Sequence, residues 1–293
     1  MSRHFLTGEE LDAGELERLI DRAQELKASP LSSDVLGRRT VALIFQAPST
    51  RTRVSFEAGI TELQGHPMVL RTEDLQLARG ESVRDTAYVL SRHAAAIGIR
   101  TGPDELVREL SQHAGVPVFN MLSAGHHPCQ ALADLLTLKE TFGRLEGLKV
   151  AYVGDGNNVA RSLAVLGALA GVEVRIASPA RYSLSAPVAG AVLSEDPREA
   201  AAGADALYTD VWVSMSDDPA SAQDRRRALQ PYRMDGELLR LAAPQAIVLH
   251  CLPAHPGEEI TEELLYGERQ RIWEQAENRR HAQKALLELL LSG

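Results

Sequence analysis

The chain has 293 residues, of which 44% are hydrophobic and 24% are charged, so it is long enough and apolar enough to bury the cores of two domains. Lys and Arg number 31 against 40 for Asp and Glu, and the net charge of −9 argues against general nucleic-acid binding, which needs a basic face. Two cysteines, Cys129 and Cys251, are too few for a disulfide framework. No secretory signal is recognisable, and no apolar run is long enough to span a bilayer. We therefore expect a cytoplasmic protein without membrane contact.

The first half of the chain predicts short apolar strands that alternate with helices. Residues 9–28 have the spacing of an amphipathic helix. The run TVALIF at 40–45 is short, rich in β-branched residues and followed closely by Pro48, which predicts a buried strand, and 54–65 then has helical spacing. Further strands are expected at 67–72, 95–101 and 116–121, with a helix at 85–94.

The second half repeats this alternation. A long helix is expected at 127–143, and a new unit begins with a strand at 149–153. The remaining elements are a helix at 157–170, strands at 172–177, 206–210 and 246–250, and a closing helix at 274–293. The segment 178–197 is too short for the usual helix between two strands.

Strands that alternate with helices indicate parallel sheets with right-handed crossovers. We therefore expect an α/β fold of two Rossmann-like domains with parallel sheets, joined by interdomain helices. The boundary should fall near 140–148, which gives a first domain at 1–140 and a second at 148–271. The C-terminal helix, at 272–293, is expected to pack back on the first domain.

The turn between the first strand and its helix carries hydroxyls and arginines in a row: Ser49, Thr50, Arg51, Thr52 and Arg53. The first N–H groups of a helix have no internal partner and the helix dipole favours negative charge, so hydroxyl donors and a bidentate arginine at this place make a socket for an oxyanion. Because the chain as a whole is acidic, the basic turn points to a small anion. The alternative is that Ser49 simply caps the helix and the arginines are solvated.

Other polar residues follow the neighbouring strands of the first domain. Arg100 ends one strand, and His127 and Gln130 lie where a helix begins after another. Ligands of open parallel sheets bind beyond the carboxyl ends of the strands, so these residues could share one crevice with 49–53. Helix capping is the alternative for His127 and Gln130. No metal site is expected, because the residues that offer ligands are too closely spaced for an ordinary zinc site: His126, His127 and Cys129.

Two strand ends of the second domain offer polar groups. Asp210 ends a strand and Ser214 follows four residues later; a carboxylate and a hydroxyl there could hold an ammonium, or could form only a strand-to-loop junction. The stretch VGDGNN at 153–158 resembles a dinucleotide-binding turn, but Val159 precedes Ala160 where a third glycine is wanted, and no acidic residue closes the next strand. The two asparagines of this stretch offer amide donors and acceptors instead.

The stretch LHCLPAH at 249–255 ends another strand. His250 next to Cys251 suggests a Cys–His nucleophile, but adjacent residues of a strand point to opposite faces, which argues against it. The bond between Leu252 and Pro253 could be cis. Such a turn would aim the backbone carbonyls of Cys251 and Leu252 into the crevice.

Five motifs occur in this order: STRTR (49–53), HPCQ (127–130), DVWVSM (210–215), HCLP (250–253) and AENR (276–279). In these motifs the chain closely resembles the ornithine carbamoyltransferases, over nearly its whole length. STRTR and HPxQ are shared with the aspartate carbamoyltransferases, whereas HCLP and DxWxSM are specific to the ornithine enzymes. The resemblance implies transfer of the carbamoyl group of carbamoyl phosphate to the δ-amine of L-ornithine, which gives L-citrulline and phosphate in arginine biosynthesis.

The resemblance also implies a role for each matching residue. Arg100 and His127 would stabilise charge on the carbonyl oxygen, and Cys251 would line the site near the amine without becoming a covalent nucleophile. The residues implied to bind carbamoyl phosphate are Ser49, Thr50, Arg51, Thr52, Gln76, Arg100, His127, Gln130, Cys251, Leu252 and Arg279. The residues implied to bind ornithine are Asn158, Asp210, Ser214 and Met215.

The family builds its sites between the subunits of a homotrimer, so the resemblance implies that Gln76 reaches into a neighbour's site. It implies no metal and no organic cofactor. Ornithine binding would then close the second domain and exclude water from a hydrolysable substrate. The sequence departs from the family at Ser216, where a glycine usually follows Ser-Met, at Ala124, where the residue is often acidic, and in the short segment 178–197.

Three alternatives remain open. A related carbamoyltransferase could use putrescine or an acylated ornithine, although Asp210 and Ser214 favour a free α-amino group. A Rossmann-like dehydrogenase is disfavoured by the missing third glycine. A non-catalytic paralogue that binds anions is disfavoured by the complete set of site residues, while Ser216 keeps it open.

Overall fold

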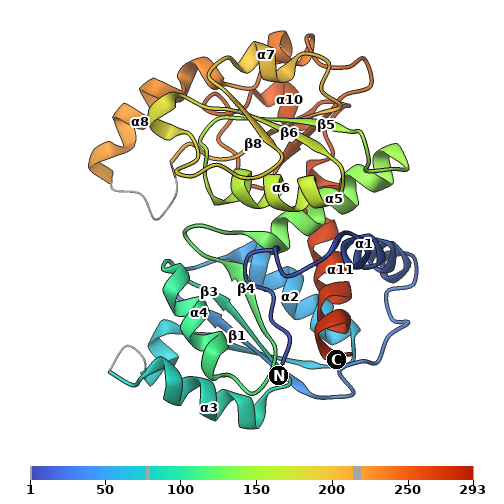
Figure 1. Ribbon diagram of the computed structural model, residues 1–293, viewed down its shortest axis with the longest axis vertical. Coiled ribbons are helices and arrows are strands. Elements are labelled where there is room, and N and C mark those ends of the chain that lie inside the picture. The colour runs from blue at the N-terminus through green and yellow to red at the C-terminus, as the bar shows by residue number, and fades with distance from the viewer. Residues whose placement is uncertain (1, 77–79, 214–218, 293) are drawn as a thin grey trace. The chain divides into compact units, whose positions relative to one another are not determined.

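The computed structural model describes residues 2–76, 80–213 and 219–292. The chain folds into two compact units: unit 1 comprises Met1–Leu136 and Glu277–Gly293, and unit 2 comprises Thr137–Ala276 (Figure 1). The division falls inside two helices, α5 (Pro128–Phe142) and α11 (Ile272–Leu291), which therefore contribute residues to both units. Within the described ranges, none of the helices is both long and apolar enough to cross a membrane.

A four-stranded parallel sheet forms the centre of unit 1. Its strands are β1 (Thr40–Phe45), β2 (His66–Arg71), β3 (Ala96–Arg100) and β4 (Val118–Leu122), in the order β2-β1-β3-β4 (Figure 1). Phe45, the last residue of β1, pairs with Arg71 on one side and with Arg100 on the other. The carboxyl ends of these three strands are therefore level with one another, at the edge where residues 46–49 leave the sheet.

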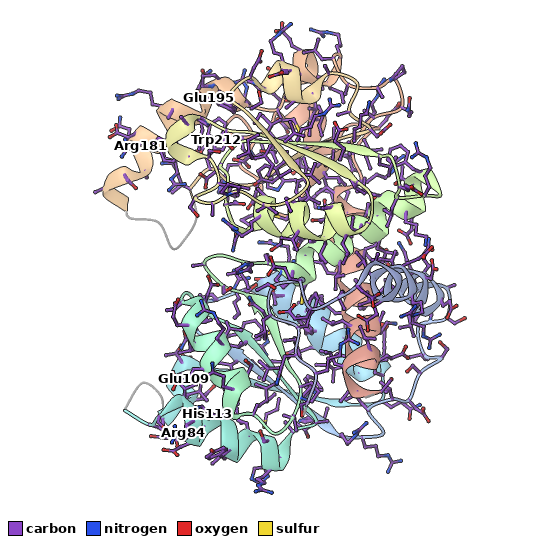
Figure 2. All side chains as sticks on the ribbon, viewed as in Figure 1. Arg84, Glu109, His113, Arg181, Glu195 and Trp212 are labelled. Carbon is purple, nitrogen blue, oxygen red and sulfur yellow. The ribbon has the colours of Figure 1, made fainter. Side chains whose placement is uncertain are left out.

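Helices cover both faces of this sheet. Successive side chains of a strand point to opposite faces, so each face has its own set of side chains to bury. The helices that lie wholly within unit 1 are α1 (Ala13–Ala28), α2 (Thr50–Glu62), α3 (Val83–His93) and α4 (Asp104–His113). Ile44 of β1 belongs to the core that includes Leu90 of α3 and Leu110 of α4. Figure 2 labels Arg84 on α3 and His113 on α4, and these two helices lie side by side. On the other face, the ring of Phe56 from α2 stacks on Phe119 from β4 with 5.1 Å between centroids.

Unit 2 is built around a five-stranded parallel sheet. Its strands are β5 (Lys149–Val153), β6 (Glu173–Ala177), β7 (Ala191–Ser194), β8 (Ala206–Thr209) and β9 (Ile247–His250), in the order β7-β6-β5-β8-β9. Its other helices are α6 (Asn158–Leu169), α7 (Pro197–Ala201), α8 (Ala222–Leu229), α9 (Gly236–Leu239) and α10 (Glu262–Tyr266). Thr209 pairs with His250, so Asp210 and Cys251 leave neighbouring strands at the same level. Trp212, labelled in Figure 2, is buried just beyond β8.

The α/β fold with two parallel sheets confirms the prediction from the sequence, and the differences lie in element boundaries. Helix α1 begins at Ala13, four residues later than expected, because Asp12 caps it with a hydrogen bond from the amide of Glu15. Helix α2 begins at Thr50 and not at residue 54, so the hydroxyls and arginines form its first turn. Strand β7 was not predicted: it is a half-exposed edge strand of four residues, and only a 3₁₀ turn, Ala180–Tyr182, connects β6 to it.

Candidate functional site

The first turn of α2 presents backbone N–H groups at the carboxyl edge of the unit 1 sheet. Ser49 occupies the N-cap position in extended conformation, but its side chain makes no capping hydrogen bond, and no acidic residue stands in the first turn. Ser49 therefore stands at the cap position, but its side chain does not cap the helix. The helix dipole and the N–H groups that have no internal partner are left to favour an anion at this end of α2.

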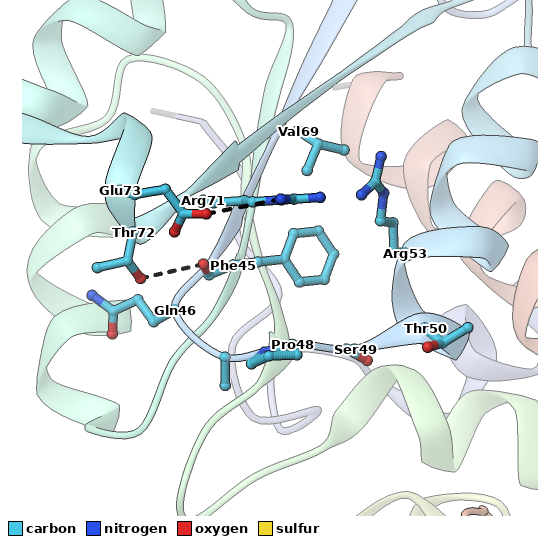
Figure 3. A pocket seen from close by; sticks show the side chains of 11 residues that line it. Phe45, Gln46, Pro48, Ser49, Thr50, Arg53, Val69, Arg71, Thr72 and Glu73 are labelled. Carbon is cyan, nitrogen blue, oxygen red and sulfur yellow. Dashed lines mark hydrogen bonds and ion pairs between the residues drawn. The ribbon is translucent and has the colours of Figure 1, made fainter.

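A pocket of about 380 Å³ lies beside this turn, lined by residues of β1, β2 and the segment 46–50. Figure 3 shows Arg53, from α2, and Arg71, from β2, around the ring of Phe45. Arg53 donates from Nε to Oε1 of Glu57 at 2.7 Å, one turn along its own helix. The arginine that ends the STRTR motif is therefore engaged by a carboxylate, whereas Ser49 and Thr50 line the open pocket.

Thr52 is the point at which two arginines from distant parts of the chain meet. Its Oγ1 accepts hydrogen bonds from Nη1 of Arg100, at 3.3 Å, and from Nη2 of Arg279, at 2.8 Å. Arg279 also donates from Nη1 to Oε1 of Gln130, and the same nitrogen lies 3.5 Å from Nε2 of His127. Thr52, His127, Gln130 and Arg279 are all at most 5% exposed. The structure thus brings together five of the residues that the sequence predicted.

His127 is neutral in this environment. Burial, and then the positive charges of Arg279 and Arg100, hold the pKa of His127 well below its usual value of 6.5. A neutral imidazole can donate one hydrogen bond and accept another, so His127 can polarise a carbonyl group without carrying a charge. The two positive charges of the cluster then belong to Arg100 and Arg279.

The loop before His127 is held by a carboxylate of α4. Asp104 accepts hydrogen bonds from the amide of Gly125, at 3.3 Å, and faces Nδ1 of His126 at 3.5 Å. Burial raises the pKa of Asp104, but hydrogen bonds from Ser123 and Gly125, together with His126, lower it more, so its pKa lies below the usual value. A Cβ at position 125 would overlap this carboxylate, so a larger residue there would force either the loop or the Asp104 side chain to shift.

In unit 2, the carboxylate of Asp210 lies just beyond β8 and is 7% exposed. Its Oδ2 accepts a hydrogen bond from Nδ2 of Asn157 at 2.9 Å, and its Oδ1 accepts one from the thiol of Cys251 at 2.8 Å. Because each oxygen still has a further lone pair, Asp210 can also accept bonds from a cation such as an ammonium group.

The turn after β9 is held by the imidazole of His250. Nδ1 of His250 accepts the amide hydrogen of Leu252 at 2.8 Å, so the ring proton is on Nε2, which donates to Oε1 of the buried Glu259 at 3.1 Å. Leu252 has a φ of 61°, and the bond to Pro253 is cis, as the sequence suggested. His250 therefore shapes the turn through its ring and is not the base of a Cys–His pair, which contradicts the nucleophile interpretation.

The residues considered for a metal site and for a dinucleotide-binding turn make structural contacts. Cys129 donates its thiol to the carbonyl of Asn120 at 3.3 Å, and burial raises its pKa to about 12, so it remains protonated. Gly156 is required by packing, since a Cβ there would lie 2.7 Å from the amide nitrogen of Leu184. Gly156 thus lets the segment after β6 approach the turn closely.

The remaining predicted residues are placed as follows. Arg51 is half-buried in the first turn of α2, and Asn158 is half-buried as the first residue of α6. Gln76 is exposed. Ser214, Met215 and Ser216 lie outside the described residues.

The sequence did not reveal the contacts of three residues that hold the site. Asn157 was predicted as the first residue of a helix, with an amide that offers donors and acceptors; the structure makes it the N-cap of α6, a position that asparagine prefers, and pairs its amide with Asp210. Glu259, which binds His250, and Asp104, which binds the loop before His127, carry no local signal, because nothing in a sequence marks an acidic residue as buried.

Comparison with known proteins agrees with this geometry. Residues 3–140 match the carbamoyl-phosphate-binding domain of the aspartate/ornithine carbamoyltransferases, and residues 146–290 match the Asp/Orn-binding domain of the same family. The ornithine carbamoyltransferase of Acidothermus cellulolyticus is 51% identical over 99% of this chain and 97% of its own length.

Solved structures show the same relationship. That of ornithine carbamoyltransferase from Pyrococcus furiosus has a TM-score of 0.94 and 42% identity, and covers 100% of this chain and 98% of that one. The enzyme from Thermus thermophilus has a TM-score of 0.91 and 44% identity, with 99% of each chain covered. The resemblance seen in the sequence motifs is thereby confirmed, and the chain belongs to the aspartate/ornithine carbamoyltransferase family.

Proposed function

We propose that this protein is an ornithine carbamoyltransferase. It transfers the carbamoyl group of carbamoyl phosphate to the δ-amine of L-ornithine and forms L-citrulline and phosphate. The observation that carries the proposal is the convergence of Arg100 and Arg279 on Thr52 in the first turn of α2, in a chain whose full-length relatives are ornithine carbamoyltransferases.

Residues 1–140, with the C-terminal helix at 272–293, bind carbamoyl phosphate in this proposal. The phosphate takes the N–H groups and hydroxyls at the start of α2, where it is also met by guanidinium groups. Arg100 bridges the phosphate and the carbonyl oxygen, and neutral His127 donates to that oxygen. The residues assigned to carbamoyl phosphate are Ser49, Thr50, Arg51, Thr52, Arg100, His127, Gln130, Arg279 and the backbone carbonyls of Cys251 and Leu252.

Residues 148–271 bind ornithine. The buried carboxylate of Asp210 takes the α-ammonium group, and Asn158 takes the carboxylate together with Ser214 and Met215, two residues assigned from the family resemblance alone. The δ-amine of ornithine has a lysine-like pKa of about 10, so the site must select or create its neutral form before the nitrogen can attack the carbonyl carbon.

The proposed chemistry needs charge stabilisation and no covalent intermediate. As the nitrogen attacks, negative charge develops on the carbonyl oxygen, and Arg100, Thr52 and His127 stabilise it. The start of α2 then stabilises the departing phosphate. Metal ions and organic cofactors have no part in these steps.

The protein acts as a cytoplasmic homotrimer in this proposal. The support is the family resemblance, which implies that Gln76 reaches into the site of a neighbouring subunit. The exposed position of Gln76 leaves it accessible to a second copy, and the open pocket beside Ser49 and Thr50 has room for a side chain from a neighbour.

The test is citrulline formation from carbamoyl phosphate and L-ornithine by the purified protein, with parallel reactions on aspartate, putrescine and N-acetylornithine. We expect citrulline with ornithine alone, and loss of activity in the Arg51→Ala variant. Turnover with another amine only would contradict the assignment of Asp210. A folded protein that binds carbamoyl phosphate but transfers its carbamoyl group to no amine would support the non-catalytic alternative.

A further inference from the structure

The amide of Asn157 has only one orientation that its surroundings permit. Its Oδ1 accepts hydrogen bonds from the backbone amides of Val159, at 3.0 Å, and Ala160, at 3.2 Å, and from the hydroxyl of Tyr152, at 3.1 Å. At the other end, its Nδ2 lies 2.9 Å from Oδ2 of Asp210, a group that only accepts. A flipped amide would set NH₂ against three donors and an oxygen against a carboxylate.

The hydroxyl of Tyr152 stays protonated and therefore donates to Oδ1 of this amide. Tyr152 is fully buried in β5, and burial, reinforced by the negative charge of Asp210, raises its pKa well above the usual value of 10. Tyr152 pairs with Tyr208 of β8, so Asn157 lies across the ends of two adjacent strands. The amide thereby connects β5, β8 and the start of α6.

The carboxylate of Asp210 is held at both of its oxygens. Asn157 donates to Oδ2 and Cys251 donates to Oδ1, so the plane of the carboxylate cannot rotate without the loss of a hydrogen bond. A thiol is a weak donor, whereas the amide NH₂ of Asn157 makes a bond of normal length to a charged group. Asn157 is therefore the stronger of the two restraints.

We propose that Asn157 is a positioning residue, which orients the carboxylate of Asp210 toward the α-ammonium group of the amine substrate. This inference rests on the proposed function and adds a residue that selects amino acids with a free α-amino group. Asn157 caps α6, and the first residue of that helix is Asn158. The same turn therefore contributes to the proposed site for the α-ammonium group of ornithine, through Asp210, and to the proposed site for its carboxylate, through Asn158.

The test separates the two roles of Asn157. In Asn157→Ser, an oxygen that can cap α6 remains, because serine caps helices about as well as asparagine, but the shorter side chain has no NH₂ group that reaches Asp210. We expect the melting temperature of this variant to stay close to that of the wild type. The KM for ornithine should rise about tenfold or more, the usual effect of losing a hydrogen bond to a charged group, while the KM for carbamoyl phosphate stays within about twofold.

The inhibition constants of two competitive inhibitors distinguish a positioning role of Asn157 from a purely structural one. L-norvaline has the α-ammonium and carboxylate of ornithine but lacks the δ-amine, whereas 5-aminovalerate has the δ-amine and the carboxylate but lacks the α-ammonium. In Asn157→Ser the inhibition constant of L-norvaline should rise about tenfold or more, and that of 5-aminovalerate should not change. An equal rise for both inhibitors would indicate general damage and would overturn the inference.

The matched control is Asp235→Ala, which removes the capping bonds of another helix of unit 2, α9. We expect a lower melting temperature and an unchanged ratio of the two inhibition constants. An unchanged L-norvaline constant in Asn157→Ser, with a wild type that forms citrulline, overturns the inference and leaves the proposed function intact. A wild type that forms no citrulline contradicts the proposed function itself.

Discussion

Arg279 donates a hydrogen bond from Nη2 to Oγ1 of Thr52 across 2.8 Å, although 227 positions separate the two residues in the chain. Thr52 lies in the first turn of α2, and Arg279 lies on α11, the last helix. The proposed anion site at the start of α2 is therefore completed by the C-terminal part of unit 1. The two nitrogens at the end of the Arg279 guanidinium serve different partners, Thr52 and Gln130.

This fork of two hydrogen bonds, to Thr52 and Gln130, can be tested with the variant Arg279→Lys. A lysine keeps the positive charge but has one compact ammonium group, which cannot reproduce two divergent bonds. We expect the KM for carbamoyl phosphate to rise about tenfold or more. The matched control is Arg280→Lys on the same helix, at a residue that pairs with Glu62 and stands outside the cluster. If Arg279→Lys binds carbamoyl phosphate as the wild type does, the fork is not needed.

Gly125 allows the loop before His127 to approach Asp104, so Gly125→Ala should displace this loop or the Asp104 carboxylate that holds it. Because the proposed catalysis depends on the position of His127 to a fraction of an ångström, we expect kcat/KM to fall by about tenfold or more. Steady-state rates with both substrates measure this effect. Gly102→Ala is the control, since a Cβ at position 102 meets nothing within 4 Å, and it should keep wild-type rates. Equal rates in the two variants would contradict a positional role for Gly125.

His281 predicts a pH dependence of stability. Burial, with the charges of Lys284 and Arg280, lowers the pKa of this histidine to about 4 in the folded state, whereas an unfolded histidine titrates near 6.5. Between these values the unfolded chain binds a proton that the folded chain does not, so stability is complete above pH 6.5 and falls as the pH drops to 4.

The variant His281→Gln cannot titrate and should lack this contribution. We expect the free energy of unfolding of the wild type to fall by up to about 1.4 kcal/mol more per pH unit than that of the variant, between pH 6.5 and 4. Denaturant unfolding at several pH values measures both slopes, and His127 contributes equally to each. Parallel slopes would show that His281 titrates alike in the folded and unfolded chains.

Cys251 donates to Asp210, and both ring nitrogens of the adjacent His250 bond to Leu252 and Glu259, so Cys251→Ala should remain an active enzyme. We expect kcat to fall less than tenfold, whereas loss of a covalent nucleophile costs about 10⁴-fold or more. The KM for ornithine should rise several-fold, because Oδ1 of Asp210 loses a donor. Rates and a search for a carbamoylated thiol by mass spectrometry decide between the two roles.

Much of the fold could be predicted from local patterns. The run at 40–45 and the strand at 149–153 were found because buried parallel strands are short apolar runs, and the helix at 127–143 because of its length. Strand β7 escaped because an edge strand of four half-exposed residues has no such pattern. The start of α2 was placed too late because its first turn is polar, and helical periodicity is visible only where one face is apolar.

The sequence by itself determined the kind of chemistry, since hydroxyls and arginines between a strand and a helix are a local motif whose place at a helix N-terminus follows from neighbouring residues. Only the tertiary structure decided which groups complete it. Thr52 meets Arg279, and Asp210 meets Asn157, because sheets and helices pack segments together that are 227 and 53 positions apart. Helical and strand periodicities report which face of an element is buried, and carry no information on the partner that covers it.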